Sequence, residues 1–224
     1  MPAKGNSKGI KLKNLKKIGK KSLIEITSDF IDKVGIFDLK ILSSENKRIL
    51  KLANKLNFYC IKRPKKLSSQ FISDYQVIKH SIGAIKKIIT ADYIVYLQPT
   101  SPIRHIPHLK HAIKEVINKN LDGAWSVSLA DKKNHPLKIL FIDKNKNLKL
   151  FDKKGKKIVA RQMLNNIYIR NGVFYIFSIK SLIKQKTIYL KKIYPSITNY
   201  ETSNIDTFLD LKDARMIYNK NSFL

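Results

Sequence analysis

The chain has 224 residues, and its 45 Lys and Arg against 16 Asp and Glu give a formal net charge of +29 with neutral histidines. Because 43% of the residues are apolar and only eight are Gly and seven are Pro, the chain can bury enough surface to fold, which excludes disordered, collagen-like and low-complexity proteins. No apolar run reaches the roughly 18 residues that a membrane-spanning helix needs, and Met1 opens into a polar loop rather than a signal sequence. We therefore expect a cytoplasmic protein without a membrane partner.

The positive charge raises the question of nucleic-acid binding, because neutralising phosphates supplies most of the non-specific affinity for DNA and RNA. Only six of the 45 basic residues are arginine, however, and the lysines are spread along the whole chain. Reading of bases favours the planar guanidinium of arginine. The sequence therefore favours a solvated lysine surface over a specific nucleic-acid partner, and a basic nucleic-acid-binding protein is kept as an alternative.

Apolar periodicity predicts helices and strands that alternate along the chain. In chain order they are helix 22–34, strand 37–43, helix 45–56, strand 58–62, helix 73–89, strand 93–97, helix 106–119, strand 124–129, short strands 139–142 and 148–151, strand 173–177, helix 179–185, strand 187–190 and helix 207–219. The alternation predicts one α/β domain over 1–224, Rossmann-like, with a mostly parallel sheet and helices on both faces. The two short strands predict a small antiparallel insertion at 135–170.

Ligands of open α/β sheets bind beyond the carboxyl ends of the strands, so the polar segments there are the candidate site. The first is 2–14, in which Gly5 and Gly9 allow close approach of backbone N–H groups and four lysines supply positive charge. Its spacing is not that of a Walker A loop, and composition alone favours a solvated basic N-terminus over a phosphate-binding loop. In 203–207, alternation places Asn204 and Asp206 on one face just before a helix.

Two further segments present polar side chains. In 97–104, two prolines fix the path after the most apolar strand, and the donors are Gln98, Thr100, Ser101 and Arg104. The other segment runs from 161 to 175. Three histidines at 105, 108 and 111 have no acidic neighbour, and a helical wheel predicts that at most two share a face, so a zinc site is disfavoured.

Together these segments resemble the acylneuraminate cytidylyltransferase family, the enzymes that make CMP-sialic acid and related CMP-nonulosonates. Six elements carry the resemblance in order over nearly the whole chain: P-A-K-G-N-S-K-G-I-K-L-K-N at 2–14, R-P at 63–64 with Leu67, L-Q-P-T-S-P-I-R at 97–104, H-P-L-K at 135–138, R-Q at 161–162 and N-G-V-F-Y at 171–175. The resemblance implies a nucleotide-diphospho-sugar transferase type of fold, and it implies that 135–170 is a dimerisation arm reaching into the site of a partner.

The reaction that the resemblance implies is attack by the anomeric hydroxyl of an acidic nine-carbon sugar on the α-phosphate of CTP, with release of pyrophosphate. Lys13 and Asp206 would be catalytic. The nucleotide would be bound by Lys4, Gly5, Asn6, Ser7, Lys8, Gly9, Asn14, Arg63 and Ser73. The sugar would be bound by Gln98, Ser101, Arg161, Asn171 and Tyr175, with Arg161 suited to the sugar carboxylate and acting in trans within a homodimer.

Three departures from the family pattern bear on activity. The family binds Mg²⁺ with a D-x-D pair, and here Asp206 keeps the second carboxylate while Asn204 replaces the first, which leaves one negative charge fewer beside the cation. Glu45 and Gln70 each stand where the family has Asp. A catalytically impaired nucleotide-binding relative is therefore one alternative. A transferase for the eight-carbon acid sugar of lipopolysaccharide is another, ranked lower because its relatives lack the pattern at 98–102.

The start of the chain differs as well. In the family an apolar strand precedes the P-A-R motif, whereas here Met1 stands where that strand should end. We expect that a first β-strand is missing before Met1 and that its absence leaves a gap between two neighbouring strands. Restoring upstream residues should then raise the melting temperature by many degrees.

Overall fold

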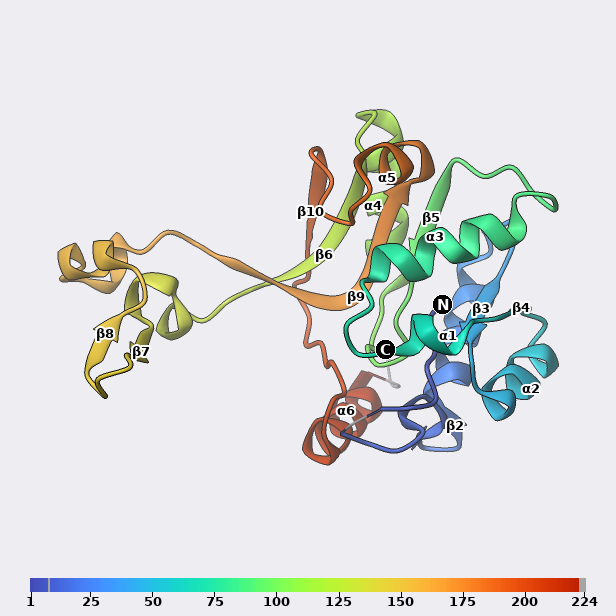
Figure 1. The fold of residues 1–224 in the computed structure, drawn as a ribbon, viewed down its shortest axis with the longest axis horizontal. Coiled ribbons are helices and arrows are strands. Elements are labelled where there is room, and N and C mark those ends of the chain that lie inside the picture. The colour runs from blue at the N-terminus through green and yellow to red at the C-terminus, as the bar shows by residue number, and fades with distance from the viewer. Residues whose placement is uncertain (8, 222–224) are drawn as a thin grey trace.

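The computed structural model describes residues 1–7 and 9–221. These residues form an α/β body from which a long arm projects (Figure 1). The body holds a four-stranded sheet in the order β10–β6–β9–β5 and a separate pair, β3–β4. The bounds of these strands are β3 (Ile41–Ser44), β4 (Tyr59–Lys62), β5 (Tyr93–Tyr96), β6 (Gly123–Leu129), β9 (Tyr168–Ser178) and β10 (Ile193–Ile197). A small antiparallel hairpin, β1 (Lys17–Ile18) with β2 (Lys21–Ser22), precedes them.

The predicted mostly parallel sheet needs one correction. β3 pairs with β4 and β6 pairs with β10 in parallel, but β9 lies antiparallel between β5 and β6. The physical reason is the insertion: the chain leaves the body along β6, passes through the arm and returns directly beside β6 as β9, and two adjacent strands joined in this way run antiparallel.

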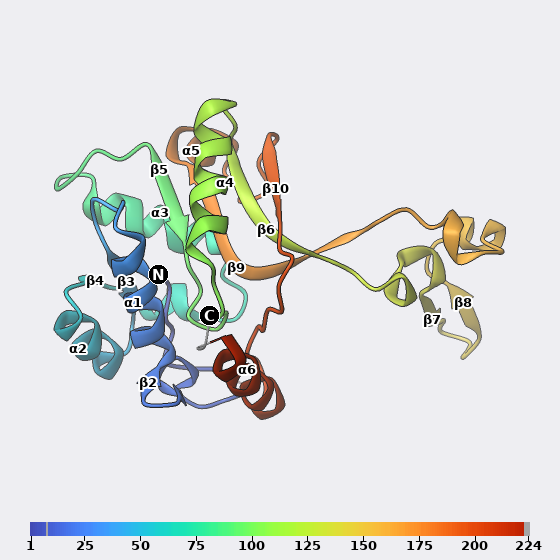
Figure 2. The ribbon, with the colours of Figure 1, turned by 180° about the vertical axis from the view of Figure 1, so that it is seen from behind.

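Helices cover both faces of the sheet (Figure 2). α1 (Leu23–Val34) and α4 (Ile106–Asn118) share one apolar cluster with the sheet, and α3 (Asp74–Ile85) and α5 (Ile179–Gln185) share another. α2 (Lys47–Lys55) packs on β3 and β4, and α6 (Phe208–Asn221) packs near β1. Serines 22 and 73 form capping boxes at the starts of α1 and α3, which is why those helices begin where the sequence predicts.

Two predicted strands differ from the structure. No ladder forms at 187–190; Ile188 and Leu190 instead fill the apolar cluster under α3 and α5, and the strand that follows is β10. The strand predicted at 37–43 pairs with β4 only from Ile41 onward. Both errors arise because a short apolar run that packs on a core has the same pattern as one that joins a ladder.

The arm between β6 and β9 consists of the hairpin β7 (Leu140–Ile142) and β8 (Leu148–Leu150) with short 3₁₀ turns around it. Figures 1 and 2 show it extending far from the body. Its large apolar side chains are exposed, among them Ile142, Leu148, Phe151 and Val159 at 69%, 64%, 67% and 88%. Among the described residues, none of the helices is long and apolar enough to cross a membrane.

Candidate active site

The N-terminal loop is tied to Glu45 near its start and is closed on itself near its end. Near its start, the backbone N–H of Gly5 donates to Glu45 Oε1 at 2.7 Å, and that of Asn6 donates to the same oxygen at 3.4 Å. Near its end, Asn14 Nδ2 donates to the carbonyl of Lys4 at 2.9 Å, which closes the loop on itself. These bonds hold Gly5 and Asn6 against Glu45 and leave the Lys4 side chain exposed. The predicted residue Lys8 lies outside the described residues.

The centre of the site is the ion pair between Lys13 and Asp206, whose Nζ and Oδ1 are 2.7 Å apart. The Lys13 side chain is 11% exposed and that of Asp206 is 69% exposed, so the pair opens toward solvent from the carboxylate side. Gly9 lies against the same segment, since a Cβ added to Gly9 would approach the carbonyl oxygen of Asp206 to 2.1 Å. The structure thus brings together the two residues predicted to be catalytic.

Glu45 connects the loop to Arg63, which is predicted to bind the nucleotide. Its Oε2 accepts from the Ser68 hydroxyl at 2.9 Å and pairs with the Arg63 guanidinium at 3.3 Å. Burial opposes ionisation of Glu45, but hydrogen bonds from its own backbone N–H, from Gly5 and from Ser68, with the charge of Arg63, outweigh burial and lower the pKa of Glu45. Arg63 Nε is buried and has no hydrogen-bond partner in the described part of the chain.

On the other side of Asp206, the loop after β5 meets Gly172 within β9. Gly172 has φ +73°, and a Cβ on it would approach Ser101 Oγ to 2.7 Å and Gln98 Oε1 to 2.9 Å. The carbonyl of Thr100 accepts from the backbone N–H of Ile205 at 2.8 Å. The predicted sugar residues Gln98 and Ser101 therefore lie next to the segment that carries Asp206.

Three side chains near this junction point inward instead of toward a ligand. Ser101, predicted to bind the sugar, is fully buried, and its hydroxyl donates to the carbonyl of Asn171 at 3.3 Å. Asn171 is 7% exposed and uses its whole amide inside the protein: Oδ1 accepts from Ser126, and Nδ2 donates to Ser128 and Thr198. The Asn171 amide is therefore bonded within the protein and does not face a ligand, contrary to its predicted role in sugar binding. Arg104, predicted to face the strand tip, donates instead to the carbonyls of β9 and of its own loop, and burial lowers its pKa to about 9.

Tyr175 lies in a group of four aromatic rings, called here the aromatic wall, which the sequence pattern does not predict. The other three members are Tyr96, Trp125 and Tyr189. The Tyr175 ring is 6.2 Å from Tyr96 and 5.8 Å, edge-on, from Trp125, and burial raises the pKa of its hydroxyl. Arg170 lies over the rings of Trp125 and Tyr189 at 5.1 and 5.3 Å, and among the described residues it forms no ion pair. The sequence carries no periodic signal for this wall, because its members come from β5, β6, β9 and the loop after α5.

Two predicted site residues lie away from this centre. Arg161 is exposed on the arm, where its guanidinium is 3.4 Å from Asp131. Ser73 is exposed and caps α3 by accepting from the N–H of Gln76 at 3.4 Å. Its neighbour Asp74 accepts from the Tyr96 hydroxyl at 2.7 Å, which ties the start of α3 to the aromatic wall.

The metal ligands predicted from sequence are adjacent, and Asn204 Nδ2 donates to Asp206 Oδ2 at 3.5 Å. Within 1–7 and 9–221, no group of three or more His, Cys, Asp or Glu could hold a metal ion. The oxygen ligands of Asp206 and Asn204 nevertheless fit Mg²⁺, which typically binds one or two protein carboxylates together with phosphate oxygens of a substrate.

His105 at the N-cap of α4, and His108 and His111 within the helix, each contact β10 or the segment after it. His105 stacks on Tyr200 with ring centroids 3.8 Å apart. His108 contacts the Tyr200 hydroxyl at 3.1 Å and the Ser196 hydroxyl at 2.7 Å, and His111 contacts a tyrosine earlier in β10. Because the strand runs along the helix, it covers more than one helical stripe. Their partners are hydroxyls, which agrees with a packing role.

Comparison with known proteins supports this arrangement of motifs. A family model described as cytidylyltransferase matches residues 1–223. The pseudaminic acid cytidylyltransferase of Campylobacter jejuni is 27% identical over 230 aligned residues, covering 99% of this chain and 95% of that protein. The CMP-N,N'-diacetyllegionaminic acid synthase of Legionella pneumophila is 27% identical, covering 94% and 90%. The N-acylneuraminate cytidylyltransferase of Escherichia coli O18:K1:H7 is 25% identical, covering 99% of this chain and 52% of that protein.

Two solved structures share the fold. The CMP:2-keto-3-deoxy-manno-octonic acid synthetase complexed with CTP matches with a TM-score of 0.71 at 12% identity, covering 98% of this chain and 97% of that chain. The 4-diphosphocytidyl-2C-methyl-D-erythritol synthase of Anaerococcus prevotii matches with a TM-score of 0.61 at 13% identity, covering 97% and 96%. With the family match over nearly the whole length, the chain belongs to the cytidylyltransferase family and is a nucleotidyltransferase of the acylneuraminate type.

Proposed function

We propose that the protein transfers CMP from CTP to the anomeric hydroxyl of a nonulosonic acid of the sialic, legionaminic or pseudaminic type, with release of pyrophosphate. The observation that carries this proposal is the Lys13–Asp206 pair, 2.7 Å long. It lies between the N-terminal loop, which is rich in N–H groups and lysines, and the loop of Gln98 and Ser101. We place the α-phosphate of CTP and the nonulosonic acid next to each other at this junction, beside the cation and the carboxylate.

The nucleotide end of the proposed site is the loop of Gly5 and Asn6 with Lys4, Lys13 and Arg63. Because the Gly5 and Asn6 N–H groups donate to Glu45, the ammonium groups of Lys4 and Lys13 are the groups that would stabilise phosphate oxygens, and a fixed loop does so without reorganising during the reaction. Arg63 Nε is a buried donor without a partner among the described residues. An acceptor oxygen of the nucleotide that reached it would satisfy a group that otherwise costs stability.

The sugar end is the aromatic wall with Gln98. The carboxylate of a nonulosonic acid requires a cation, and arginine binds carboxylates with two parallel hydrogen bonds. Arg170 is exposed beside the wall within the same chain and forms no ion pair among the described residues. Arg161 is on the arm and is available to the site of a second chain.

The arm supports a proposal that the enzyme works as a homodimer. A two-stranded hairpin is marginally stable by itself in water, and exposed apolar patches of this kind mark interaction surfaces. Leu148, Phe151 and Val159 would be buried if the arm packed on a second copy. In that dimer Arg161 would approach the sugar site of the partner.

In the reaction we propose, the anomeric oxygen forms a bond to the α-phosphorus and loses its proton, while the bond from that phosphorus to the β-phosphate oxygen breaks and pyrophosphate leaves. Lys13 neutralises charge on the phosphate that is attacked, and the two ends of the site hold the reactants in line. We also propose Mg²⁺, held by Asp206 and Asn204. When bound, it would neutralise charge on the triphosphate and on the leaving pyrophosphate.

The test is pyrophosphate release with CTP, Mg²⁺ and each of the three nonulosonic acids, with the eight-carbon acid sugar and UTP as controls. We expect turnover with CTP and one nonulosonic acid, and its loss in Asp206→Ala. Turnover only with the eight-carbon sugar would contradict the proposed substrate class. If the protein bound CTP but converted none of the acids, it would be a catalytically impaired relative, and the proposed activity would be wrong.

A further inference from the structure

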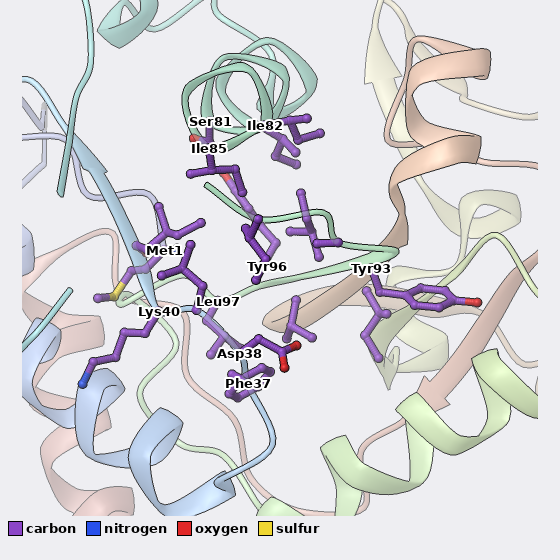
Figure 3. A pocket seen from close by; sticks show the side chains of 18 of the residues that line it. Met1, Phe37, Asp38, Lys40, Ser81, Ile82, Ile85, Tyr93, Tyr96 and Leu97 are labelled. Carbon is purple, nitrogen blue, oxygen red and sulfur yellow. Dashed lines mark hydrogen bonds between the residues drawn. The ribbon is translucent and has the colours of Figure 1, made fainter. Parts of the chain in front are cut away.

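Two features of the body have no part in the proposed reaction. One is a cleft of about 370 Å³ between β3 and β5, which Figure 3 shows with Ser81 and Ile85 of α3 on one side. The other is the group of three histidines on α4. Of the described residues that line the cleft, none belongs to the segment that carries Asp206, whereas the histidines contact that segment directly. The histidines are therefore the feature whose contacts bear on the active site.

The segment between β10 and α6, residues 198–207, forms neither helix nor strand and carries Asp206. Near its two ends, the N–H of Thr198 donates to a carbonyl of β6 and the N–H of Ile205 donates to the carbonyl of Thr100, both at 2.8 Å. Figure 2 shows the chain passing the start of α4 on its way from β10 to α6. Segments without regular ladders open locally at a low free energy, so the place of Asp206 depends on side-chain contacts between these ends.

Tyr200 holds the middle of segment 198–207 against α4. Its ring stacks on His105 with centroids 3.8 Å apart, and its hydroxyl is 3.1 Å from His108 Nδ1. The other ring nitrogen of His108, Nε2, is 2.7 Å from the hydroxyl of Ser196 in β10. Burial raises the pKa of the Tyr200 hydroxyl to about 12, which keeps it a neutral hydrogen-bonding group. One imidazole thus joins the last strand and the segment after it to the same helix.

The His108 ring is suited to bind two hydroxyls at once. A neutral imidazole has one donor nitrogen and one acceptor nitrogen, and a hydroxyl can complement either of them. Burial, with the neighbouring His105 and His111, lowers the pKa of His108, which favours the neutral ring at pH 7. The ring also packs against the buried Phe174, with centroids 5.0 Å apart. The core therefore fixes where this imidazole lies.

The start of α4 is itself fixed to the sheet and to α1. Arg104 directly precedes His105, and its Nε donates to the carbonyl of Val173 in β9 at 2.8 Å. Its guanidinium also donates to the hydroxyl of Thr27 in α1 at 3.4 Å. A shift of this end of α4 would leave buried donors and acceptors without partners, which costs free energy. The helix therefore gives segment 198–207 a rigid support.

We infer that His108 is a positioning residue: it holds Tyr200, and through Tyr200 the course of segment 198–207, so that Asp206 stays 2.7 Å from Lys13. The inference rests on the proposed function, in which Lys13 and Asp206 act together. A misplacement of about 1 Å at reacting groups can cost roughly a hundredfold in rate. A contact six residues before Asp206 can therefore control the reaction without touching a substrate.

The first test compares hydrogen exchange in His108→Ala and in the matched control His111→Ala, without any substrate. His111 lies one turn further along the same helix, is exposed, and contacts a tyrosine of β10 instead of the segment that carries Asp206. We expect the Ile205 amide to exchange at least about tenfold faster in His108→Ala than in the wild type. His111→Ala should leave this exchange unchanged.

The second test measures kinetics with CTP, Mg²⁺ and the nonulosonic acid that the wild type converts. We expect His108→Ala to lower kcat by about ten- to a hundredfold and to change KM for CTP less than about twofold, because the nucleotide end of the site is not altered. Tyr200→Phe keeps the ring on His105 and removes only the hydroxyl, so its loss should be smaller. His108→Asn, whose amide offers a donor and an acceptor close to the place of Nδ1, should restore most of kcat.

Two results would overturn the inference. Equal exchange of the Ile205 amide in His108→Ala and His111→Ala would show that His108 does not hold the segment. Faster exchange in His108→Ala with an unchanged kcat would show that the held position does not matter for the reaction. A wild-type protein that converted none of the acids would instead refute the proposed function, and the exchange comparison would still decide whether His108 holds the segment.

Discussion

At the scale of single residues, Lys13 has the most direct role in the proposed reaction. Its side chain is 11% exposed and its ammonium is 2.7 Å from Asp206. Replacing it by methionine keeps most of the side-chain volume and removes the charge. We expect Lys13→Met to lower kcat by roughly 10²- to 10³-fold, the usual loss when one preorganised electrostatic contact to the transition state is removed. The melting temperature should change little because the exposed Asp206 stays solvated.

The matched control for this variant is Lys20→Met, which removes the same charge from an exposed position in the hairpin turn between β1 and β2. It should keep the wild-type kcat. Equal activity of Lys13→Met and Lys20→Met in a pyrophosphate-release assay would refute the role that we assign to Lys13.

Asn204→Asp is a substitution that we expect to strengthen the proposed Mg²⁺ site rather than weaken it. It lies next to Asp206 and presents a neutral amide where a second carboxylate would add a negative charge. Because ligand charge helps to set the affinity of oxygen-ligand cation sites, we expect Asn204→Asp to lower the Mg²⁺ concentration for half-maximal activity roughly tenfold. A Mg²⁺ titration measures this, and an unchanged or higher requirement would argue against a cation at this position.

Glu45 makes stability depend on pH. Its pKa is lowered in the folded state, as described above, so the folded protein holds fewer protons on it than the unfolded chain does. The resulting stabilisation is complete above the unfolded pKa of about 4.3 and is lost as pH falls through the lower folded pKa. We expect Glu45→Gln to reduce the melting temperature clearly at pH 7 and less as pH falls below about 4. A constant difference across melting curves from pH 3 to 7 would contradict this.

At the scale of elements, the N-terminal loop depends on close backbone contact. Gly9 leaves no room for a side chain, because a Cβ would lie 2.1 Å from the carbonyl oxygen of Asp206. Gly9→Ala should therefore displace the loop from Asp206 and reduce kcat/KM at least about tenfold, the scale on which small misplacements of reacting groups act. A titration with CTP should show weaker binding as well.

Gly83→Ala is the control for this change, since a Cβ at that position in α3 has open space within 4 Å. It should raise stability slightly, because alanine favours helix more than glycine does, and it should leave activity unchanged. If Gly9→Ala matched it in activity, the contact between Gly9 and the Asp206 segment would not matter for the reaction.

Some of these elements, and the central pair of the site, could be predicted from the sequence. Helices with a clear apolar stripe and a capping serine, such as α1 and α3, were predicted to within a few residues. Motif order also predicted that Lys13 and Asp206 belong to one site. The direction of β9 could not be read, since an apolar run has the same pattern in a parallel or an antiparallel ladder. The inward orientation of the Arg104 side chain could not be predicted either, because Arg104 donates to a carbonyl of β9, which is distant in sequence.

At the scale of the whole molecule, the arm, which carries Arg161, projects away from the body (Figure 1). If the arm reaches a partner, two variants with complementary defects should restore activity when mixed. Lys13→Met and Arg161→Ala should each be weakly active alone. Random mixed dimers would hold one intact site, giving about a quarter of wild-type activity. Activity that stays at the level of the separate variants, with subunit exchange verified, would place Arg161 outside the partner's site.

Phosphorus NMR of the reaction tests most directly whether the protein joins CMP to a nonulosonic acid. With CTP, Mg²⁺ and the three acids, we predict that the three triphosphate signals are replaced by one phosphodiester signal and by pyrophosphate in equal amounts, and only when an acid is present. Conversion of CTP to CMP or CDP without a phosphodiester, or no conversion by a folded protein that binds CTP, would contradict it.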